Sequence, residues 1–292
     1  IWSRHYDKPS LVPNDLPAQL AAQHPLTDGH ANHYRRGVAV GPLRGLNTIG
    51  HGGLWPGYRT EFLRVPGVDL TVVVIANLAT INPWRLARAV AVEALAGTSA
   101  LAKAVPNATA AEIKPISGWW FSPDEPGLFE LSWKNSEPTV TQNGMPFALA
   151  RRSDGWLGAE AGALEFALKP LRAGVVRVDH GAGRIVTYKK LGKRKAVPAA
   201  IEGVYTSPDS GAVWHVRRGG KDFTIAVSGP LVGGGAPWTV NGLDGDTVEI
   251  VSPPGWIQAT QLAHLVRDRA GKVTALVVST GRIKKMRFER TG

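Results

Sequence analysis

The stretch Gly50-His51-Gly52-Gly53-Leu54-Trp55-Pro56-Gly57-Tyr58-Arg59-Thr60 is the densest mixture of glycine, histidine and aromatic residues in the first hundred positions. A glycine inside a strand costs about 0.5–1 kcal/mol, so repeated glycines indicate a local requirement. Two interpretations are open from these residues alone. One is a tight turn between strands. The other is a strand edge without side chains that faces a ligand beside a working histidine, His51.

Composition narrows the class of protein. The chain has 292 residues, of which 43% are apolar and 20% charged, and this indicates two or three globular domains. The absence of cysteine excludes disulfides, a thiol nucleophile and thiolate metal sites. No apolar run reaches the ~18 residues of a membrane helix, so we expect no membrane partner. Because the chain starts at Ile1 without a signal peptide, we expect a processed, truncated or excerpted protein.

The chain carries a net charge of +11, and basic residues cluster late in it, at 189–195 and 282–290. Such clusters are one signature of nucleic-acid binding. No helix-turn-helix, RRM or OB-type aromatic pattern accompanies them, and a solvated strand end and linker is the preferred explanation. We therefore expect no nucleic-acid partner and keep a basic nucleic-acid binder as a third candidate.

Around the glycine-rich stretch the pattern predicts short strands. The connections between them are short and contain Gly or Pro, which favours an antiparallel meander. A helix is expected before them at Leu16–Ala22. The last strand is nearly all apolar, so we expect it to be covered on both faces. The expected strands are Tyr34–Val40, Leu46–Ile49, Tyr58–Val65 and Leu70–Ala76.

A helix is predicted to follow these strands. Asn82 is its expected cap, Pro83 its first residue, and Gly97 closes it. Its expected apolar face consists of Leu86, Ala87, Val90, Ala91, Ala94 and Leu95. Residues 34–97 are therefore expected to form an antiparallel sheet with a helix across it.

The remaining chain contains an internal repeat. Residues 98–115 are rich in Ala, Pro, Asn and Thr and are expected to be a linker. The segment Ile116–Glu125 then recurs 85 residues later as Ile201–Ser210. Short strands with glycine-rich turns around each copy predict two small antiparallel barrels, 116–195 and 196–292. The aromatic residues of the opening strands, Trp119, Trp120 and Tyr205, are expected to supply core.

The ordered run of strand, His-Gly-Gly, Pro-Gly turn, two strands and capped helix resembles the C-terminal end of the catalytic domain of serine β-lactamase-like hydrolases. This group contains class C β-lactamases, D-alanyl-D-alanine carboxypeptidases and D-aminopeptidases. The trailing barrels resemble those of the D-aminopeptidase branch. The resemblance covers residues 1–97 and then 116–292. Its motifs are Asp28-Gly29 with Tyr34 and Gly37, Gly50–Gly53, Pro56–Arg59 and Val72–Asn77.

The resemblance implies an α+β fold, namely the C-terminal part of a β-lactamase-like antiparallel sheet with helices, followed by two small antiparallel β-barrels. It places His51-Gly52-Gly53 at the family's third motif, which implies a catalytic role for His51 and substrate binding by Gly52 and Gly53. The family's nucleophile motif Ser-x-x-Lys and its second motif Tyr-x-Asn occur nowhere in the chain. We therefore expect a catalytically inactive chain whose parent is a serine hydrolase of short peptides or amides, without cofactor or metal.

Other glycine and histidine groups are weaker candidates. The segment Gly229–Trp238, with Gly233, Gly234 and Gly235, is either a long hairpin loop or, by the same resemblance, a loop that limits substrate size. His30 and His33 are three residues apart, but Asp28-Gly29 favours a loop over a metal site. His180, His215 and His264 are expected to be structural.

Alternatives remain open within and beyond this family. An esterase or a penicillin-binding carboxypeptidase is a variant of the same enzyme class. A non-catalytic protein that binds a peptide or a cell-wall ligand belongs to a different class. The sequence also leaves open a homodimer, and it does not distinguish the bacterial cytoplasm from the periplasm.

Overall fold

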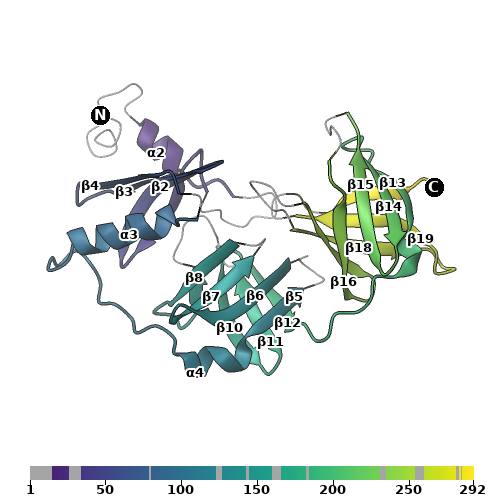
Figure 1. The fold of residues 1–292 in the computed structure, drawn as a ribbon. Helices are drawn as coiled ribbons and strands as arrows, with labels where there is room; N and C mark the ends of the chain where they lie inside the picture. Colours follow the sequence, from purple (N-terminus) through teal and green to yellow (C-terminus); the bar gives the residue numbers. More distant parts are fainter. Residues whose placement is uncertain are drawn as a thin grey trace. The chain divides into compact units, whose positions relative to one another are not determined.

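The computed structural model describes residues 15–25, 34–78, 80–122, 127–142, 145–159, 166–181, 184–230, 235–253, 260–280, 283 and 285–292. These residues form one four-stranded sheet and two closed barrels (Figure 1). Each of the three bodies is described by itself below.

The first body is an antiparallel sheet with strand order β1-β2-β3-β4. The predicted strands Tyr58–Val65 and Leu70–Ala76 are confirmed. Strand β2 continues through Gly50–Gly53 to Trp55, so it is longer than the expected strand Leu46–Ile49. The tight turn of the glycine-rich stretch lies at its expected Pro56-Gly57 connection. The elements are α2 (Leu16–Ala21), β1 (Ala39–Leu43), β2 (Leu46–Trp55), β3 (Tyr58–Val65), β4 (Leu70–Ala76) and α3 (Pro83–Ala94).

The predicted helix α3 lies across one face of this sheet. The Asn82 side chain accepts a hydrogen bond from the Arg85 backbone N–H at 3.1 Å, which confirms the expected cap. Ala87 and Ala91 are fully buried in a cluster with side chains of β3 and β4. The other half of the predicted apolar face is exposed, with Leu86 at 41% and Val90 at 45%.

Strand β4 is covered on one face only. Val72 and Val74 pack in the cluster under α3. Val73 and Ile75 point the other way and are 57% and 77% exposed. The expectation that this strand is covered on both faces is therefore wrong for the described part of the chain, where α3 lies on one side of the sheet.

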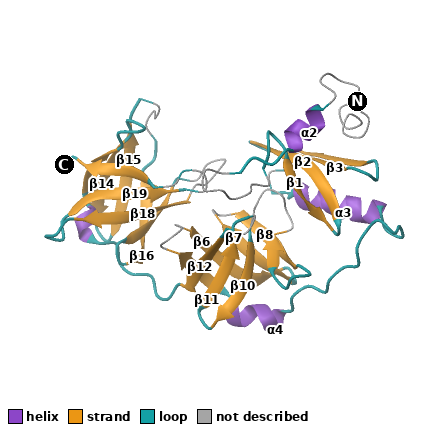
Figure 2. Ribbon diagram, turned by 180° about the vertical axis from the view of Figure 1, so that it is seen from behind, coloured by secondary structure: helices purple, strands orange, loops and turns teal. Residues whose placement is uncertain are grey.

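Two closed barrels follow (Figures 1 and 2). In each barrel the first strand pairs with the last, β5 with β12 and β13 with β20. The first barrel comprises β5 (Gly118–Ser122), β6 (Gly127–Lys134), β7 (Glu137–Gln142), β8 (Met145–Arg151), β9 (Leu157–Ala159), β10 (Ala167–Arg172), β11 (Val175–Asp179) and β12 (Ile185–Lys190), after the short helix α4 (Ala110–Ile113). The second comprises β13 (Gly203–Thr206), β14 (Val213–Gly219), β15 (Asp222–Ser228), β16 (Trp238–Asp244), β17 (Thr247–Val251), β18 (Thr260–Arg267), β19 (Val273–Ser279) and β20 (Met286–Arg290).

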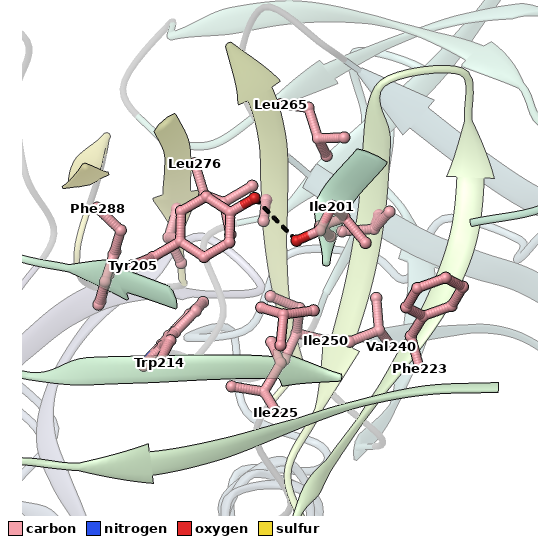
Figure 3. Packing of buried hydrophobic residues seen from close by; sticks show 14 of the residues in the cluster. Ile201, Tyr205, Trp214, Phe223, Ile225, Val240, Ile250, Leu265, Leu276 and Phe288 are labelled. Carbon is pink, nitrogen blue, oxygen red and sulfur yellow. Dashed lines mark hydrogen bonds between the residues drawn. The ribbon is translucent and has the colours of Figure 1, made fainter. Parts of the chain in front are cut away.

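Aromatic side chains from the opening strands fill the barrel cores. Tyr205 is fully buried, and its hydroxyl donates a hydrogen bond to the Ile201 carbonyl at 2.8 Å (Figure 3). Trp214 stacks on Phe288 in the same cluster, with ring centroids 4.1 Å apart. Trp120 occupies the repeat position of Tyr205 and is 1% exposed. The predicted barrels and the core roles of Trp120 and Tyr205 are confirmed.

The expected α+β fold class is wrong. Strands dominate the described residues, and no helix-rich domain of the β-lactamase type accompanies the sheet there. The physical reason is that the alternating pattern and frequent turns of residues 116–292 produce only strands, while the sheet of residues 39–76 carries a single long helix. None of the described helices is long and apolar enough to cross a membrane.

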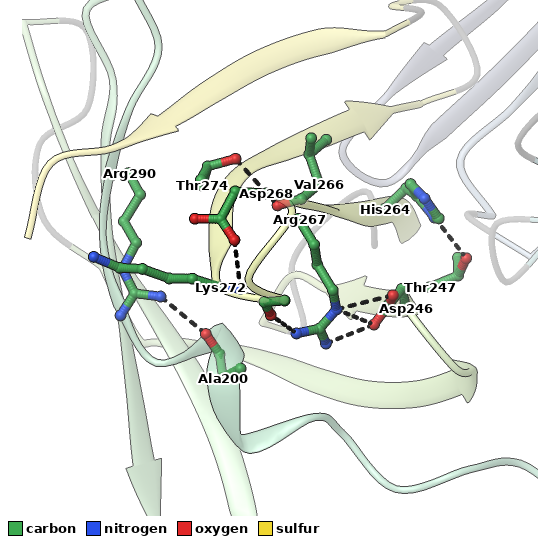
Figure 4. A network of polar contacts seen from close by, with 11 residues as sticks. Ala200, Asp246, Thr247, His264, Val266, Arg267, Asp268, Lys272, Thr274 and Arg290 are labelled. Atoms are coloured by element: carbon green, nitrogen blue, oxygen red, sulfur yellow. Dashed lines mark hydrogen bonds and ion pairs between the residues drawn. The ribbon is translucent and has the colours of Figure 1, made fainter.

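Part of the basic charge is paired within the fold. In the linker before the second barrel, Arg194 pairs with Glu249 at 2.6 Å and Lys195 pairs with Asp244 at 2.9 Å. At one end of that barrel, Arg267 binds Asp246 at 2.7 Å (Figure 4). The hydrogen bond from Arg267 lowers the pKa of Asp246. These contacts support a structural interpretation of these cations.

Polar contacts at the same end also involve His264 and Arg290 (Figure 4). His264 Nδ1 lies 3.3 Å from the Thr247 hydroxyl, across the β17–β18 pair. Arg290 donates to the carbonyl of Ala200 at 3.0 Å. The first contact links neighbouring strands, and the second links β20 to the helical turn Ala199–Ile201 before β13. A contact between strands agrees with a structural role for His264.

Candidate functional site

His51 stands on one face of β2 between two glycines. In the antiparallel register His51 lies opposite Phe62, and Gly52 lies opposite Glu61. Glu61 lies opposite Val74, which is buried under α3. Because side chains alternate along a strand, His51 and Phe62 share the face away from α3, called the front face here. Gly52 and Glu61 belong to the face under α3, called the back face.

Among the described residues, no strand pairs with the outer edge of β2 beside His51. Strand β1 pairs with β2 only from Leu46 to Gly50, where Ala39 is the last partner. Beyond that point, within the described residues, His51–Trp55 pairs with β3 alone. An unpaired strand edge presents backbone N–H and C=O groups that an extended peptide can bind. The open edge therefore begins at the His51-Gly52-Gly53 segment.

Tyr34 contacts His51 on the front face. Its hydroxyl oxygen lies 3.0 Å from His51 Nε2, and the two rings are tilted by 57°. Both side chains are exposed. A neutral imidazole with an unprotonated Nε2 accepts a hydrogen bond from the phenol, whereas an imidazolium donates one to the phenol oxygen. The pair can therefore hold a proton at the rim of the open edge.

A pocket of about 470 Å³ lies beside this pair. Its walls are largely apolar, and His51 and Arg36 bring the polar groups to it. A short ligand with an apolar side chain could place that side chain here and its backbone along the open edge. The lining side chains come from α2 (Leu16, Leu20), from the segment before β1 (Arg36, Val38) and from the sheet (His51, Phe62).

The glycines of this strand are required by the packing around them. A Cβ on Gly52 would lie 2.3 Å from Trp84 Nε1 of α3. A Cβ on Gly53 would lie 2.3 Å from the Thr60 hydroxyl of β3. Non-bonded heavy atoms do not approach this closely, so a side chain at either position would force its neighbour to move. Packing within the protein therefore explains both glycines without a ligand.

Glu61 is a buried carboxyl group on the back face. The residue is 4% exposed, and its Oε2 atom has no hydrogen-bond partner among the described residues. Burial raises the pKa of Glu61 to about 7, and the positive charge of Arg88 on α3 opposes this shift. Loss of hydration outweighs the attraction of the cation.

The structure describes some of the other predicted candidates. Gly235 is exposed ahead of β16, whereas Gly233, Gly234, Asp28-Gly29, His30 and His33 lie outside the described residues. His180 Nε2 lies 3.0 Å from the hydroxyl of buried Tyr188, and His215 lies in β14. Within the described ranges, no three residues among His, Asp and Glu stand close enough to hold a metal ion.

Sequence reasoning assigned no site role to Tyr34, Phe62, Glu61 or Trp84. Tyr34 was among the residues of the family resemblance, and Phe62 and Glu61 carried a signal in the strand alternation. The strand alternation places Phe62 apart from Leu63, and it places Glu61 on the apolar side of the same strand. The contacts of Tyr34 and Trp84 depend on how distant segments pack.

No protein-family model matches the chain, and no curated protein matches it. Two solved structures are similar at low scores. The octameric penicillin-binding protein homologue from Pyrococcus abyssi shares 11% identity at a TM-score of 0.30, covering 98% of this chain and 44% of that one. SurE with D-Leu shares 15% identity at a TM-score of 0.32, covering 99% and 48%. This chain thus spans less than half the length of either structure.

The contact between Gly53 and Thr60 can be tested with a double-mutant cycle. We expect Gly53→Ala to destabilise the sheet by about 1–3 kcal/mol, because its Cβ would overlap the Thr60 hydroxyl. In a Thr60→Ala background most of this loss should disappear, since the nearest remaining atom, the Cβ of residue 60, lies 3.6 Å away. Urea unfolding of the four proteins measures the coupling. Equal losses in both backgrounds would contradict the packing explanation.

The burial of Glu61 predicts a pH-dependent stability. The folded-state pKa is raised from 4.5 to about 7, so the folded protein binds the proton more tightly than the unfolded chain. Stability is therefore lost as pH rises through this window, by about 3 kcal/mol at most. Glu61→Gln cannot ionise. Between about pH 4 and about pH 8, its free energy of unfolding relative to that of the native protein should therefore rise by that amount.

Urea unfolding across this pH range measures the gain of Glu61→Gln. Glu93→Gln on the exposed side of α3 is the matched control. Parallel stability curves for native protein and Glu61→Gln would show that the carboxyl group is hydrated in solution.

Proposed function

We propose that this chain binds the substrate of an acyl-transfer serine hydrolase that acts on short peptides or amides, in the manner of a D-aminopeptidase. The observation that carries the proposal is the open edge of β2 at His51-Gly52-Gly53, flanked by the Tyr34–His51 hydrogen bond and an apolar pocket. In this proposal residues 1–97 hold the site, 98–115 form a linker, and 116–195 and 196–292 are the barrel domains.

The open edge suits an extended substrate. A peptide added beside His51–Trp55 forms backbone hydrogen bonds, and Gly52 and Gly53 present no side chains that obstruct it. A backbone N–H on this edge can also stabilise the oxyanion of a tetrahedral intermediate, where one donor is worth ~2.7–4 kcal/mol. The Tyr34–His51 pair holds a proton next to the reacting group.

The attacking group comes from outside these 292 residues in this proposal, because the chain contains no Ser-x-x-Lys. Removal of the serine from such a catalytic unit lowers kcat by about 10⁶-fold. The chain alone should therefore bind substrate without turning it over.

A non-catalytic peptide-binding protein is the second candidate, and the same open edge favours it. The two candidates differ in what completes the site. The hydrolase needs polypeptide that carries a serine nucleophile and its base, whereas the binding protein needs nothing beyond the edge and the pocket. An esterase or a penicillin-binding carboxypeptidase differs from the first candidate only in its substrate.

The chain alone should not react covalently with a fluorophosphonate or β-lactam probe, as measured by intact-protein mass spectrometry. It should bind a D-amino acid amide, and His51→Ala and Tyr34→Phe should weaken that binding, as measured by NMR titration. His215→Ala in the second barrel is the matched control. Acylation with turnover would overturn the proposed absence of a nucleophile. Unchanged affinity in His51→Ala would overturn the site.

The loop at Gly233, Gly234 and Gly235 is proposed to limit substrate length. Deleting these three residues should narrow the difference in affinity between a D-dipeptide amide and a D-hexapeptide amide, because the longer ligand would no longer be excluded. Isothermal titration calorimetry on the full chain measures both affinities. An unchanged ratio would remove the loop from the proposal.

A further inference from the structure

Two side chains, those of Glu61 and Trp84, lie against the back face of β2. A Cβ on Gly50 would lie 2.5 Å from the Phe62 carbonyl oxygen and 3.2 Å from Glu61 Oε1, so the carboxyl group is the nearest side-chain group behind this glycine. The Trp84 indole fills the corresponding space behind Gly52. The backbone that carries His51 therefore lies directly on the Glu61 carboxyl group and the Trp84 ring.

The surroundings of Glu61 suit its neutral form. On one side Glu61 lies opposite Gly52 of β2, and on the other side it lies opposite Val74 of β4. Arg88 on α3 is the one charged group with a resolved electrostatic effect on the pKa of Glu61 among the described residues. An ionised carboxylate cannot stay unpaired in such a place and is drawn toward this cation or toward water.

Arg88 connects this movement to the strands. Its Nη2 atom lies 3.4 Å from the Thr48 hydroxyl of β2, and that hydroxyl donates to the Gly41 carbonyl of β1 at 2.9 Å. Thr48 and Gly41 are paired in the sheet where β1 covers β2. An ionised Glu61 therefore competes with Thr48 for this guanidinium.

We propose that Glu61 is a positioning residue whose protonation sets the position of the Gly50–Gly53 backbone, and with it the alignment of the open edge. Neutral Glu61 supports the strand as the structure shows it. Ionised Glu61 moves toward Arg88 and withdraws that support. The consequence for substrate rests on the function proposed above, whereas the coupling of Glu61 to Gly52 does not.

The raised pKa of Glu61, about 7, places this change near neutral pH. The aligned form is expected below that pH and the displaced form above it. Substrate binding at the edge should accordingly weaken as pH rises through this range.

The coupling can be measured at a single backbone group. His51→Gln removes the nearby imidazole from the measurement, and it creates a unique Gln-Gly pair, since none of the native glutamines precedes a glycine. Labelling glutamine with ¹³C at the carbonyl and glycine with ¹⁵N then gives one NMR signal, that of the Gly52 amide. The full chain is used.

In His51→Gln we expect the Gly52 amide shift to change in one step centred near pH 7, and we expect the step to be lost in His51→Gln/Glu61→Gln. Arg88→Met in the His51→Gln background should move the midpoint to higher pH, because it removes the cation that lowers the pKa of Glu61. Glu93→Gln on the exposed side of α3 should leave the step unchanged.

A flat Gly52 shift, a step that survives Glu61→Gln, or a midpoint unaffected by Arg88→Met would each overturn the proposal. The last comparison decides the question even where Glu61→Gln does not fold. Because this readout involves no ligand, an intact titration without any binding of a D-amino acid amide would refute the proposed function alone.

Discussion

The close packing of α3 on the back of β2 is the constraint on which the site depends. The Trp84 indole approaches the backbone of Gly52 so closely that no side chain fits between them. The helix could not lie at this distance over an ordinary strand. The absence of a side chain at Gly52 is thus the condition for the helix position behind the strand, while His51 projects from the opposite face beside Phe62 and Tyr34.

The same constraint explains why the edge beside His51 is available. Strand β1 leaves β2 after Gly50, so the side-chain-free segment is held from behind by α3 and from one side by β3. A glycine-rich strand without such support would lose its shape through its conformational entropy. The packing of α3 on the back face therefore keeps the outer edge of β2 ordered although no described strand pairs with it beside His51.

The sequence predicted the elements whose signals are local. The alternation of β3, the β-branched run of β4 and the Asn82 cap each lie within a few residues, and the repeat at 85 residues marked both barrels. The continuation of β2 through its glycines could not be predicted, because glycine disfavours strands and the compensating Trp84 lies 32 positions away. The contact between Tyr34 and His51 likewise depends on how the segment before β1 folds back. The prediction that β4 is covered on both faces failed for a related reason. A run of apolar residues does not indicate how many layers pack against the strand, and Val73 is exposed.

Glu61 is an ionisable residue that the local strand pattern places in an apolar layer. Its alternation partners Leu63 and Val65 are buried under α3, so the strand pattern alone places a carboxyl group in an apolar layer. Such a placement costs stability whenever the group is ionised, and a glutamine of the same shape would avoid the cost. The stability of the folded protein therefore does not explain an ionisable group at this position. Its contact with the space behind Gly50 connects it to the strand that carries His51, and a role in positioning that strand accounts for the cost.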